Sequence, residues 1–195
     1  MTWDDLAGDW DHQPGVREYA MAAFTSLQQI AAANDVELRG ARACDFGCGT
    51  GQLTEQLAPL CETVVAVDNS PRMREVLDRK AQLHDWTNVS TAVAVPAGAR
   101  FDLVACSSAL AFVADYGAMV TTLVQHLEPG GLFVQWDWEL QPGDAHGVGF
   151  TRERIASTLA ATGLHDVQVD IAFELTVDDM VMAPLVGSGV APLPS

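Results

Sequence analysis

Apolar and polar positions follow a helical period in the first part of the chain. Between residues 16 and 33 the apolar side chains recur at three- and four-residue steps, which places them on one face of a helix. They are Val16, Tyr19, Ala20, Ala23, Phe24, Leu27 and Ile30. The pattern predicts a helix over 16–33 that ends at Asn34 and Asp35.

Short apolar runs then alternate with segments of helical period. The predicted strands are 41–46, 63–67, 89–95, 102–106 and 132–136, and helices are expected to begin near Gly51, Pro71 and Tyr116. Runs such as TVVAV and DLVAC are apolar at successive positions, which is typical of parallel strands covered by helices on both faces. Glu128-Pro129-Gly130-Gly131 predicts a turn before the fifth strand.

The last part of the chain predicts a helix and a hairpin. Thr151 is a suitable cap for a helix over 151–162, and Gly163 ends it. The next segment alternates strictly, with Val167, Val169, Ile171, Phe173 and Leu175 on one side. We expect a half-exposed strand there, with 180–190 as its antiparallel partner.

Composition favours one folded domain with an acidic surface. The chain has 195 residues, with 10 Lys plus Arg against 26 Asp plus Glu and a formal charge of -16. Such a surface repels phosphate backbones and anionic lipids, so nucleic-acid and membrane partners are not expected. The charge equally serves solubility or the attraction of cationic substrates.

The amino terminus and the cysteines bear on location. The first residues are acidic and lack the basic flank and apolar core of a secretory signal, and no apolar run is long enough for a membrane span. We therefore expect a cytoplasmic protein. Cys44, Cys48, Cys61 and Cys106 form no CxxC pair, which predicts reduced thiols and no metal site.

The segment Asp45 to Gly51, DFGCGTG, follows a predicted strand and precedes a predicted helix. Its glycines allow positive φ and a close approach of backbone to a ligand, although a tight turn without a ligand would use them too. The spacing is G-x-G-x-G, whereas a dinucleotide site reads G-x-G-x-x-G. Asp45 would oppose a phosphate and favour an ammonium or sulfonium group. The loop therefore predicts a cationic nucleoside without phosphate.

Asp68 ends the strand predicted at 63–67. A carboxylate at this place can accept hydrogen bonds from both hydroxyls of a ribose. An acid there can also cap the helix that begins at Pro71. The glycine loop on the preceding strand favours the ribose interpretation.

Four segments in order resemble the class I methyltransferases that use S-adenosylmethionine, in their small-molecule branch, over roughly residues 35 to 175. They are DFGCGTG (45–51), VVAVDNSPRM (64–73), FDLVACSSAL (101–110) and LEPGGLFV (127–134). The resemblance implies an α/β, Rossmann-like, doubly wound and mostly parallel seven-stranded sheet with an antiparallel carboxy-terminal hairpin. Residues 1–34 would form a lid and helix, and 35–190 the cofactor-binding domain, in a single domain overall.

The resemblance also implies a cofactor site. Asp45 would hold the methionine ammonium through water, and Asp68 the ribose hydroxyls. The family places an acid after strand three for adenine, but this chain has none there, so backbone at Val95 is the expected substitute. The cofactor-binding residues implied are Asp45, Phe46, Gly47, Cys48, Gly49, Gly51, Asp68, Asn69, Met73, Val95, Cys106 and Ser107.

The reaction implied is direct in-line methyl transfer to a small molecule, which needs no obligatory catalytic residue. Weak candidates for a general base are Asp137, His146 and His12, each of which can equally be a solvated or turn residue. The expected acceptor pocket contains Trp10, Phe112, Trp136 and Trp138, although core packing explains a tryptophan as well. Trp10-Asp11 resembles the pair with which relatives fold a lid over the cofactor.

Two other functions stay open. One is a regulatory domain that binds S-adenosylmethionine with weak or no turnover, and the other is a nicotinamide-dependent oxidoreductase, which the glycine spacing and Asp45 disfavour. RNA or protein methylation of the kind that uses an Asn/Asp-Pro-Pro-aromatic tetrapeptide is not expected, because Ser107-Ser108-Ala109-Leu110 occupies that place.

Overall fold

A seven-stranded sheet forms the centre of the computed structural model, which describes residues 2–140 and 147–194. The strand order is β3-β2-β1-β4-β5-β9-β6, in which β9 alone runs antiparallel to its neighbours β5 and β6. The strands are β1 (Arg42–Phe46), β2 (Thr63–Val67), β3 (Val89–Ala92), β4 (Phe101–Ser107), β5 (Leu127–Asp137), β6 (His165–Ile171) and β9 (Leu185–Val190). The predicted α/β fold with its mostly parallel sheet is confirmed.

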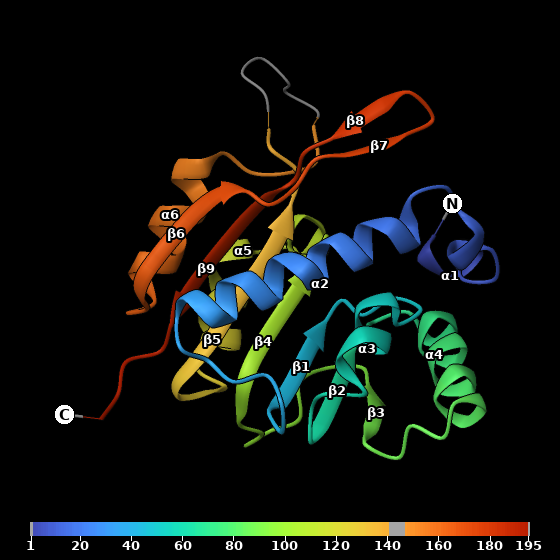
Figure 1. Ribbon diagram of the computed structural model, residues 1–195, viewed down its shortest axis with the longest axis horizontal. Coiled ribbons are helices and arrows are strands. Elements are labelled where there is room, and N and C mark those ends of the chain that lie inside the picture. The colour runs from blue at the N-terminus through green and yellow to red at the C-terminus, as the bar shows by residue number, and fades with distance from the viewer. Residues whose placement is uncertain (1, 141–146, 195) are drawn as a thin grey trace.

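Helices cover both faces of this sheet, as the continuous apolar strands require. The helix α2 crosses one face, and α5 and α6 lie on the other (Figure 1). The helices and single turns are α1 (Trp3–Leu6), η1 (Trp10–His12), α2 (Val16–Ala33), α3 (Gln52–Leu57), α4 (Pro71–Leu83), η2 (Leu110–Phe112), α5 (Tyr116–Val124) and α6 (Arg152–Ala161). The helix predicted over 16–33 has the observed bounds.

Local sequence accounts for where the helices begin. Ser70 accepts the backbone N–H of Met73 just before the proline that opens α4. Asp115 caps α5 in the same way, and Thr151 caps α6 through the N–H of Arg154. Each cap satisfies an N–H that would otherwise lack a partner.

Two predicted strand bounds were wrong. The third strand stops at Ala92 instead of 95, and the segment after it, residues 93–100, reaches β4 without a helix. The fifth strand starts at Leu127 rather than 132, because the Pro-Gly-Gly segment stays in the sheet through a register shift opposite Phe101 and Leu103. Gly130 and Gly131 there exchange backbone hydrogen bonds with Ala191.

The carboxy-terminal hairpin forms in two parts rather than as one continuous pair. β6 pairs with β9 in the main sheet, while β7 (Leu175–Val177) and β8 (Met180–Met182) make a separate two-stranded hairpin. The expected single face is therefore broken after Ile171. Val167 and Val169 pack on the side of α6, whereas Phe173 and Leu175 pack on the side of α2.

The amino-terminal helix α1 and the β7–β8 hairpin lie close to the edge of the sheet where a ligand is expected. α1 and the β7–β8 hairpin both lie at the edge where β1, β4 and β5 end (Figure 1). In open α/β sheets ligands bind at this carboxyl edge. Within the described residues, no helix is long and apolar enough to cross a membrane.

Candidate functional site

The glycine loop after β1 is bound to the neighbouring strand β2. The N–H groups of Gly47 and Cys48 both donate to the carbonyl of Val67, at 2.7 and 3.0 Å. Gly49 has φ +52°, and a Cβ placed there would have no heavy atom within 4 Å. The loop therefore leaves open space directly above Gly49.

Asp45, the fourth residue of β1, is a buried carboxylate below this loop. The hydroxyl of Thr54 in α3 donates to its Oδ2 at 2.5 Å, while Oδ1 has no partner among the described residues. Burial raises the pKa of Asp45 to about 6, against the opposing effect of the Thr54 bonds. An unpaired buried carboxylate oxygen is costly, so the site fits a cationic group.

Asp68 follows β2 and anchors the loop. Its Oδ2 accepts the N–H of Gly49 at 2.9 Å, and its Oδ1 accepts the N–H of Ser70 at 2.8 Å. A carboxylate oxygen has two acceptor sites, so each still has room for a ligand hydroxyl. The structure therefore brings Asp68 and the glycine loop together, as the sequence predicted.

The end of β4 closes the other side of the loop. Cys106 is buried and lies in register with Phe46 of β1, and Ser107 is half-buried. Ser108 has φ +52°, and Ala109 comes so close to Gly47 that a Cβ on the glycine would lie 2.1 Å from the Ala109 Cβ. The loops after β1 and β4 thus touch at Gly47.

The residues expected near adenine differ in exposure. Met73 is buried in the first turn of α4, whereas Asn69 is exposed. Val95 is half-buried in the short segment after β3. Asn69, Met73 and Val95 follow β2 and β3, on the far side of the glycine loop from β4.

The amino-terminal segment is attached to this loop by acids that sequence reasoning did not assign. Asp11 of η1 accepts the Thr50 hydroxyl at 2.5 Å and pairs with the Lys80 ammonium at 2.6 Å. Burial raises the pKa of Asp11, but Lys80 and the hydrogen bonds lower it more, so it lies below its usual value. Asp4 of α1 accepts the hydroxyl of Ser70. The only sequence signal was the Trp10-Asp11 pair.

Aromatic side chains connect the same segment to the turn after β4. Trp3 packs edge-to-face on Trp10 with ring centroids 5.8 Å apart, and on Phe112 of η2 at 5.1 Å. Phe112 is 49% exposed. Trp3 therefore joins Trp10 to Phe112, and the role of these two residues in an acceptor pocket stays a prediction.

Trp136 and Trp138, in and just after β5, do not join the aromatic contacts of Trp3 and Trp10. Trp136 is 0% exposed, and its indole N–H donates to the Ser26 hydroxyl of α2 at 3.3 Å. Its assignment to the acceptor pocket was wrong, because position 136 of β5 points into the core beneath α2. Trp138 packs against Tyr19 at 5.6 Å, so the tryptophans form no single rim.

The candidate general bases differ in where the structure places them. Asp137, the last residue of β5, is 0% exposed, so the alternative of a solvated carboxylate was wrong. His12 is exposed in η1, and His146 lies outside the described residues. Of the two candidates that the structure describes, Asp137 is buried at the carboxyl edge of the sheet and His12 is exposed.

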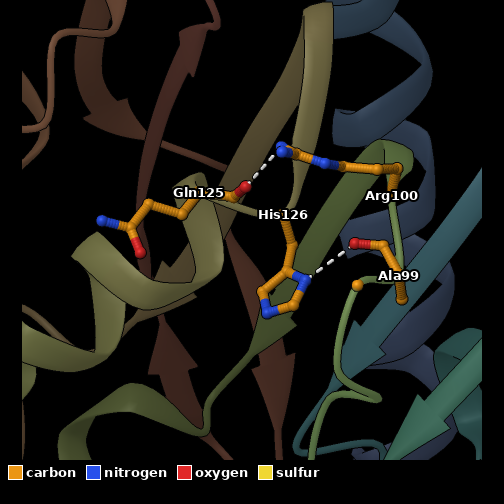
Figure 2. Close-up of a pocket in the computed structure, with 5 residues that line it drawn as sticks. Ala99, Arg100, Gln125 and His126 are labelled. Atoms are coloured by element: carbon orange, nitrogen blue, oxygen red, sulfur yellow. Dashed lines mark hydrogen bonds between the residues drawn. The ribbon is translucent and has the colours of Figure 1, made fainter.

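A surface hollow of about 550 Å³ lies at the opposite edge, where β4 and β5 begin (Figure 2). Its polar groups serve the fold: Arg100 donates to the carbonyl of Gln125 at 2.6 Å, and His126 Nδ1 bonds the carbonyl of Ala99 at 2.8 Å. Because the glycine loop lies at the other end of the strands, this hollow is separate from the candidate site.

Comparisons with known proteins agree with this geometry. A family model described as a methyltransferase domain matches residues 44–135, which include the glycine loop, Asp68 and the end of β4. Over this segment the chain is similar to the methyltransferase domain family. The ubiquinone biosynthesis O-methyltransferase of Cereibacter sphaeroides is 36% identical to this chain over 117 residues, 55% of this chain and 47% of the relative. The chain spans about half the length of the curated relatives it matches.

Solved structures of methyltransferases share the fold of this chain. A chain of the complex between the Haloferax volcanii Trm112 methyltransferase activator and a methyltransferase aligns with a TM-score of 0.75 at 19% identity, over 97% of both chains. The N-methyltransferase NodS from Bradyrhizobium japonicum, in complex with S-adenosyl-L-homocysteine, aligns with a TM-score of 0.69 at 21% identity, over 91% of this chain and 87% of NodS. At these identities the likeness concerns the fold.

Proposed function

We propose that the chain is an S-adenosylmethionine-dependent methyltransferase that methylates a small molecule by direct in-line transfer. One observation carries the proposal: among the described residues Asp45 Oδ1 is buried without a partner, at the end of β1 that leads into the loop whose Gly49 has open space above it. A cation at this oxygen would relieve the cost of the buried charge.

The site residues divide the cofactor among them. Asp45 binds the methionine ammonium, and the backbone of Gly47, Cys48 and Gly49 faces the methionine and ribose. Asp68 accepts the ribose hydroxyls with the lone pairs that Gly49 and Ser70 leave free. Further contacts come from Phe46 and Gly51 in the loop, Asn69, Met73 and Val95 near adenine, and Cys106 and Ser107 at the methionine.

The bound cofactor supplies a methyl group already activated on a sulfonium, so the protein mainly orients the acceptor and excludes water. The amino-terminal segment suits the second task, because α1 and η1 are attached to the cofactor loop. We accordingly assign residues 1–34 as a lid and helix and 35–190 as the cofactor-binding domain.

The acceptor is proposed to be a small molecule methylated on oxygen. The name of the Cereibacter sphaeroides relative supports oxygen, and the Trp3–Phe112 contact supplies aromatic surface at the site. A charge of -16 argues against nucleic acid as the acceptor.

Calorimetric titration tests the cofactor assignment. S-adenosylmethionine and S-adenosylhomocysteine should bind, and NAD should not. Asp68→Ala should weaken donor binding at least about tenfold, or roughly 1.4 kcal/mol. Glu75→Ala, which removes an exposed acid from α4, is the matched control and should change nothing. Folded protein that binds neither adenosyl compound would refute the proposal, and binding without transfer to any acceptor would favour a regulatory domain.

A further inference from the structure

Two buried carboxylate oxygens lack a hydrogen-bond partner within the described residues, and both lie near the carboxyl ends of strands. One is Asp45 Oδ1 in β1, which the proposed function assigns to the donor. The other is Asp137 Oδ1 at the end of β5. The buried Lys80 nitrogen, which also makes no hydrogen bond of good geometry, differs because it is paired with Asp11 at 2.6 Å.

The free oxygen of Asp137 is held in a defined orientation. The Tyr116 hydroxyl donates to Gln135 Oε1 at 2.8 Å, and Gln135 Nε2 donates to Asp137 Oδ2 at 3.0 Å. The tyrosine bond fixes which end of the amide faces Asp137, because a hydroxyl that donates needs the amide oxygen. All three members of this chain are buried; Oδ2 is engaged, while Oδ1 makes no hydrogen bond of good geometry with the described residues, although the Ala111 N–H also faces the carboxylate.

The position of Asp137 relates it to the donor site. The strand order places β4 between β1 and β5, and Asp137 lies three residues beyond Val134, the residue of β5 that is level with Asp45 through Ala105. Two strand spacings separate β1 from β5 by about 10 Å. The end of β4, where Cys106 and Ser107 are assigned to the methionine part, lies between the two acids. Asp137 is thus placed beyond the reacting end of the donor.

Burying this carboxylate has no evident benefit for the fold. A buried charge with an unpaired oxygen lowers stability, and natural proteins keep such groups mainly at functional sites. Burial raises the pKa of Asp137 to about 7, although the N–H of Ala111 and the Gln135 amide oppose the rise. A carboxylate with this pKa can accept a proton near neutral pH.

We propose that Asp137 Oδ1 is the catalytic base that binds and deprotonates a hydroxyl of the acceptor. This inference rests on the proposed function and names its acceptor class, a neutral phenol or enol. The acceptor O–H bond breaks and its proton goes to Asp137 Oδ1. The oxygen lone pair forms the bond to the methyl carbon, whose bond to sulfur breaks with its electrons left on sulfur.

The turn η2 lies next to Asp137. Ala111 lies in this turn, and its N–H faces the carboxylate. The next residue, Phe112, is half exposed and packs against Trp3 of α1. Since Asp137 is fully covered, the inference requires η2 to move before an acceptor can reach it, and the Trp3 contact joins η2 to the amino-terminal segment.

The groups facing Asp137 leave it as the titrating residue near pH 7. Tyr19 on α2, Cys106 on β4 and Tyr116 on α5 feel its charge, and burial raises the pKa of each above the neutral range. Arg154 of α6 lies over the Tyr116 ring, 5.7 Å from its centroid. Leu185 of β9 and the residues of η2 bring no titratable side chain.

Asp137→Asn is the decisive variant because it keeps the size of the side chain and removes the base. Wild-type protein with S-adenosylmethionine should methylate members of a panel of phenols and catechols, measured as S-adenosylhomocysteine formed. The variant should lower kcat/KM about a hundredfold or more, with the acidic limb near pH 7 lost. Calorimetry should give the same Kd for S-adenosylhomocysteine within twofold, because Asp137 does not touch the donor.

Infrared difference spectra and urea unfolding need no acceptor. The wild type should show a protonated carboxyl band that titrates near pH 7 and is absent from Asp137→Asn. At pH 8.5 the variant should be at least as stable as the wild type, since it lacks the buried charge. Tyr116→Phe serves as the comparison because it removes the hydroxyl that bonds Gln135 and keeps Asp137 itself. It should shift the infrared band of Asp137 and should reduce kcat/KM less than Asp137→Asn does.

Four results would overturn the inference: equal transfer rates in wild type and Asp137→Asn, no transfer to any phenol by wild type that binds the donor, a wild type without a titrating carboxyl band near pH 7, or a less stable variant at pH 8.5. The last would make Asp137 a structural group. Failure of the wild type to bind the donor would instead refute the proposed function itself.

Discussion

At the scale of single residues, the site is defined by where carboxylates and glycines lie relative to the ends of strands. Asp45 is useful to a cation because burial prevents water from satisfying its Oδ1. Burial also makes its charge depend on pH in the physiological range, since it raises the pKa to about 6. The affinity of the protein for the methyl donor and its product should therefore depend on pH.

We expect the affinity for S-adenosylhomocysteine to rise with pH and to level off above about pH 7. Below pH 6 the ionised fraction of Asp45 falls about tenfold per pH unit, and affinity should fall with it. Asp45→Asn should bind weakly at every pH. 5′-Methylthioadenosine, which has no ammonium group, is the control, and calorimetry from pH 5 to 8 should show no such slope for it.

Gly47 and Gly49 allow a second test, because they share positive φ but differ in surroundings. Gly47→Ala should destabilise the fold by about 3 kcal/mol, since its Cβ would lie 2.1 Å from Ala109 Cβ. Gly49→Ala should cost only about 1 kcal/mol of backbone strain, because nothing lies within 4 Å. Its methyl group would fill the cofactor space, so donor binding should be lost from a stable protein. Urea unfolding measures the stability of the two variants, and calorimetry measures their affinity for the donor. Retained affinity in Gly49→Ala would contradict the assignment of the space above Gly49 to the cofactor.

At the scale of elements, the sequence predicted the parallel strands and their helices well because these use strong local signals. In the segment 132–137 these local signals do not predict which side of the sheet a side chain faces. Its residues are buried on both sides of the sheet, so no alternation tells which side Trp136 or Asp137 faces. The sequence therefore predicted Trp136 in the pocket, which was wrong, and left Asp137 open between a general base and a solvated carboxylate, of which burial excludes the second.

The amino-terminal segment could be predicted only in outline. Its contacts with Thr50, Ser70 and Lys80 join residues far apart in the sequence, and no periodicity reveals such pairs. Likewise the alternating pattern after α6 predicted one continuous strand, yet β6 ends at Ile171 and the chain then packs on the other side of the sheet. Tertiary pairing with β9 decided that break.

The Asp11–Lys80 ion pair should control how long the segment stays closed. Lys80→Met keeps the apolar stem of the side chain and removes the ammonium, which should speed S-adenosylhomocysteine dissociation about fivefold, or about 1 kcal/mol. Tryptophan fluorescence in stopped flow can follow this, because Trp3 and Trp10 lie in the segment. Arg79→Met, on the exposed neighbour in α4, is the control. Identical dissociation rates in the two variants would show that the ion pair does not hold the lid.

At the scale of the whole molecule, acidic residues at the surface and in the core act in the same direction. The formal charge of -16 makes the folded chain repel itself at neutral pH. Inside the fold, burial raises the pKa of Asp45 to about 6 and of Asp137 to about 7, from an ordinary value of 3.8. Both effects favour a more protonated protein.

Stability should therefore be greater at pH 5.5 than at pH 8. A group whose pKa is raised by folding binds more protons in the folded state, so stability falls as pH rises from about 4 through the raised value. Between pH 5.5 and 8 the two acids together account for roughly 2–3 kcal/mol. The surface acids whose pKa is lowered, such as Asp102 beside Arg42, lose their contribution only below about pH 4.

Urea unfolding at a series of pH values and salt concentrations measures this. Asp137→Asn should remove roughly 2 kcal/mol of the decline between pH 5.5 and 8, while Asp170→Asn on the exposed edge strand β6 should leave it unchanged. Added sodium chloride should stabilise the protein at pH 8 by screening the surface, and should leave the part due to the buried acids in place. A wild type that becomes more stable up to pH 8 would mean that Asp45 and Asp137 are ionised in the fold without cost, and hence that their unpaired oxygens have partners in solution.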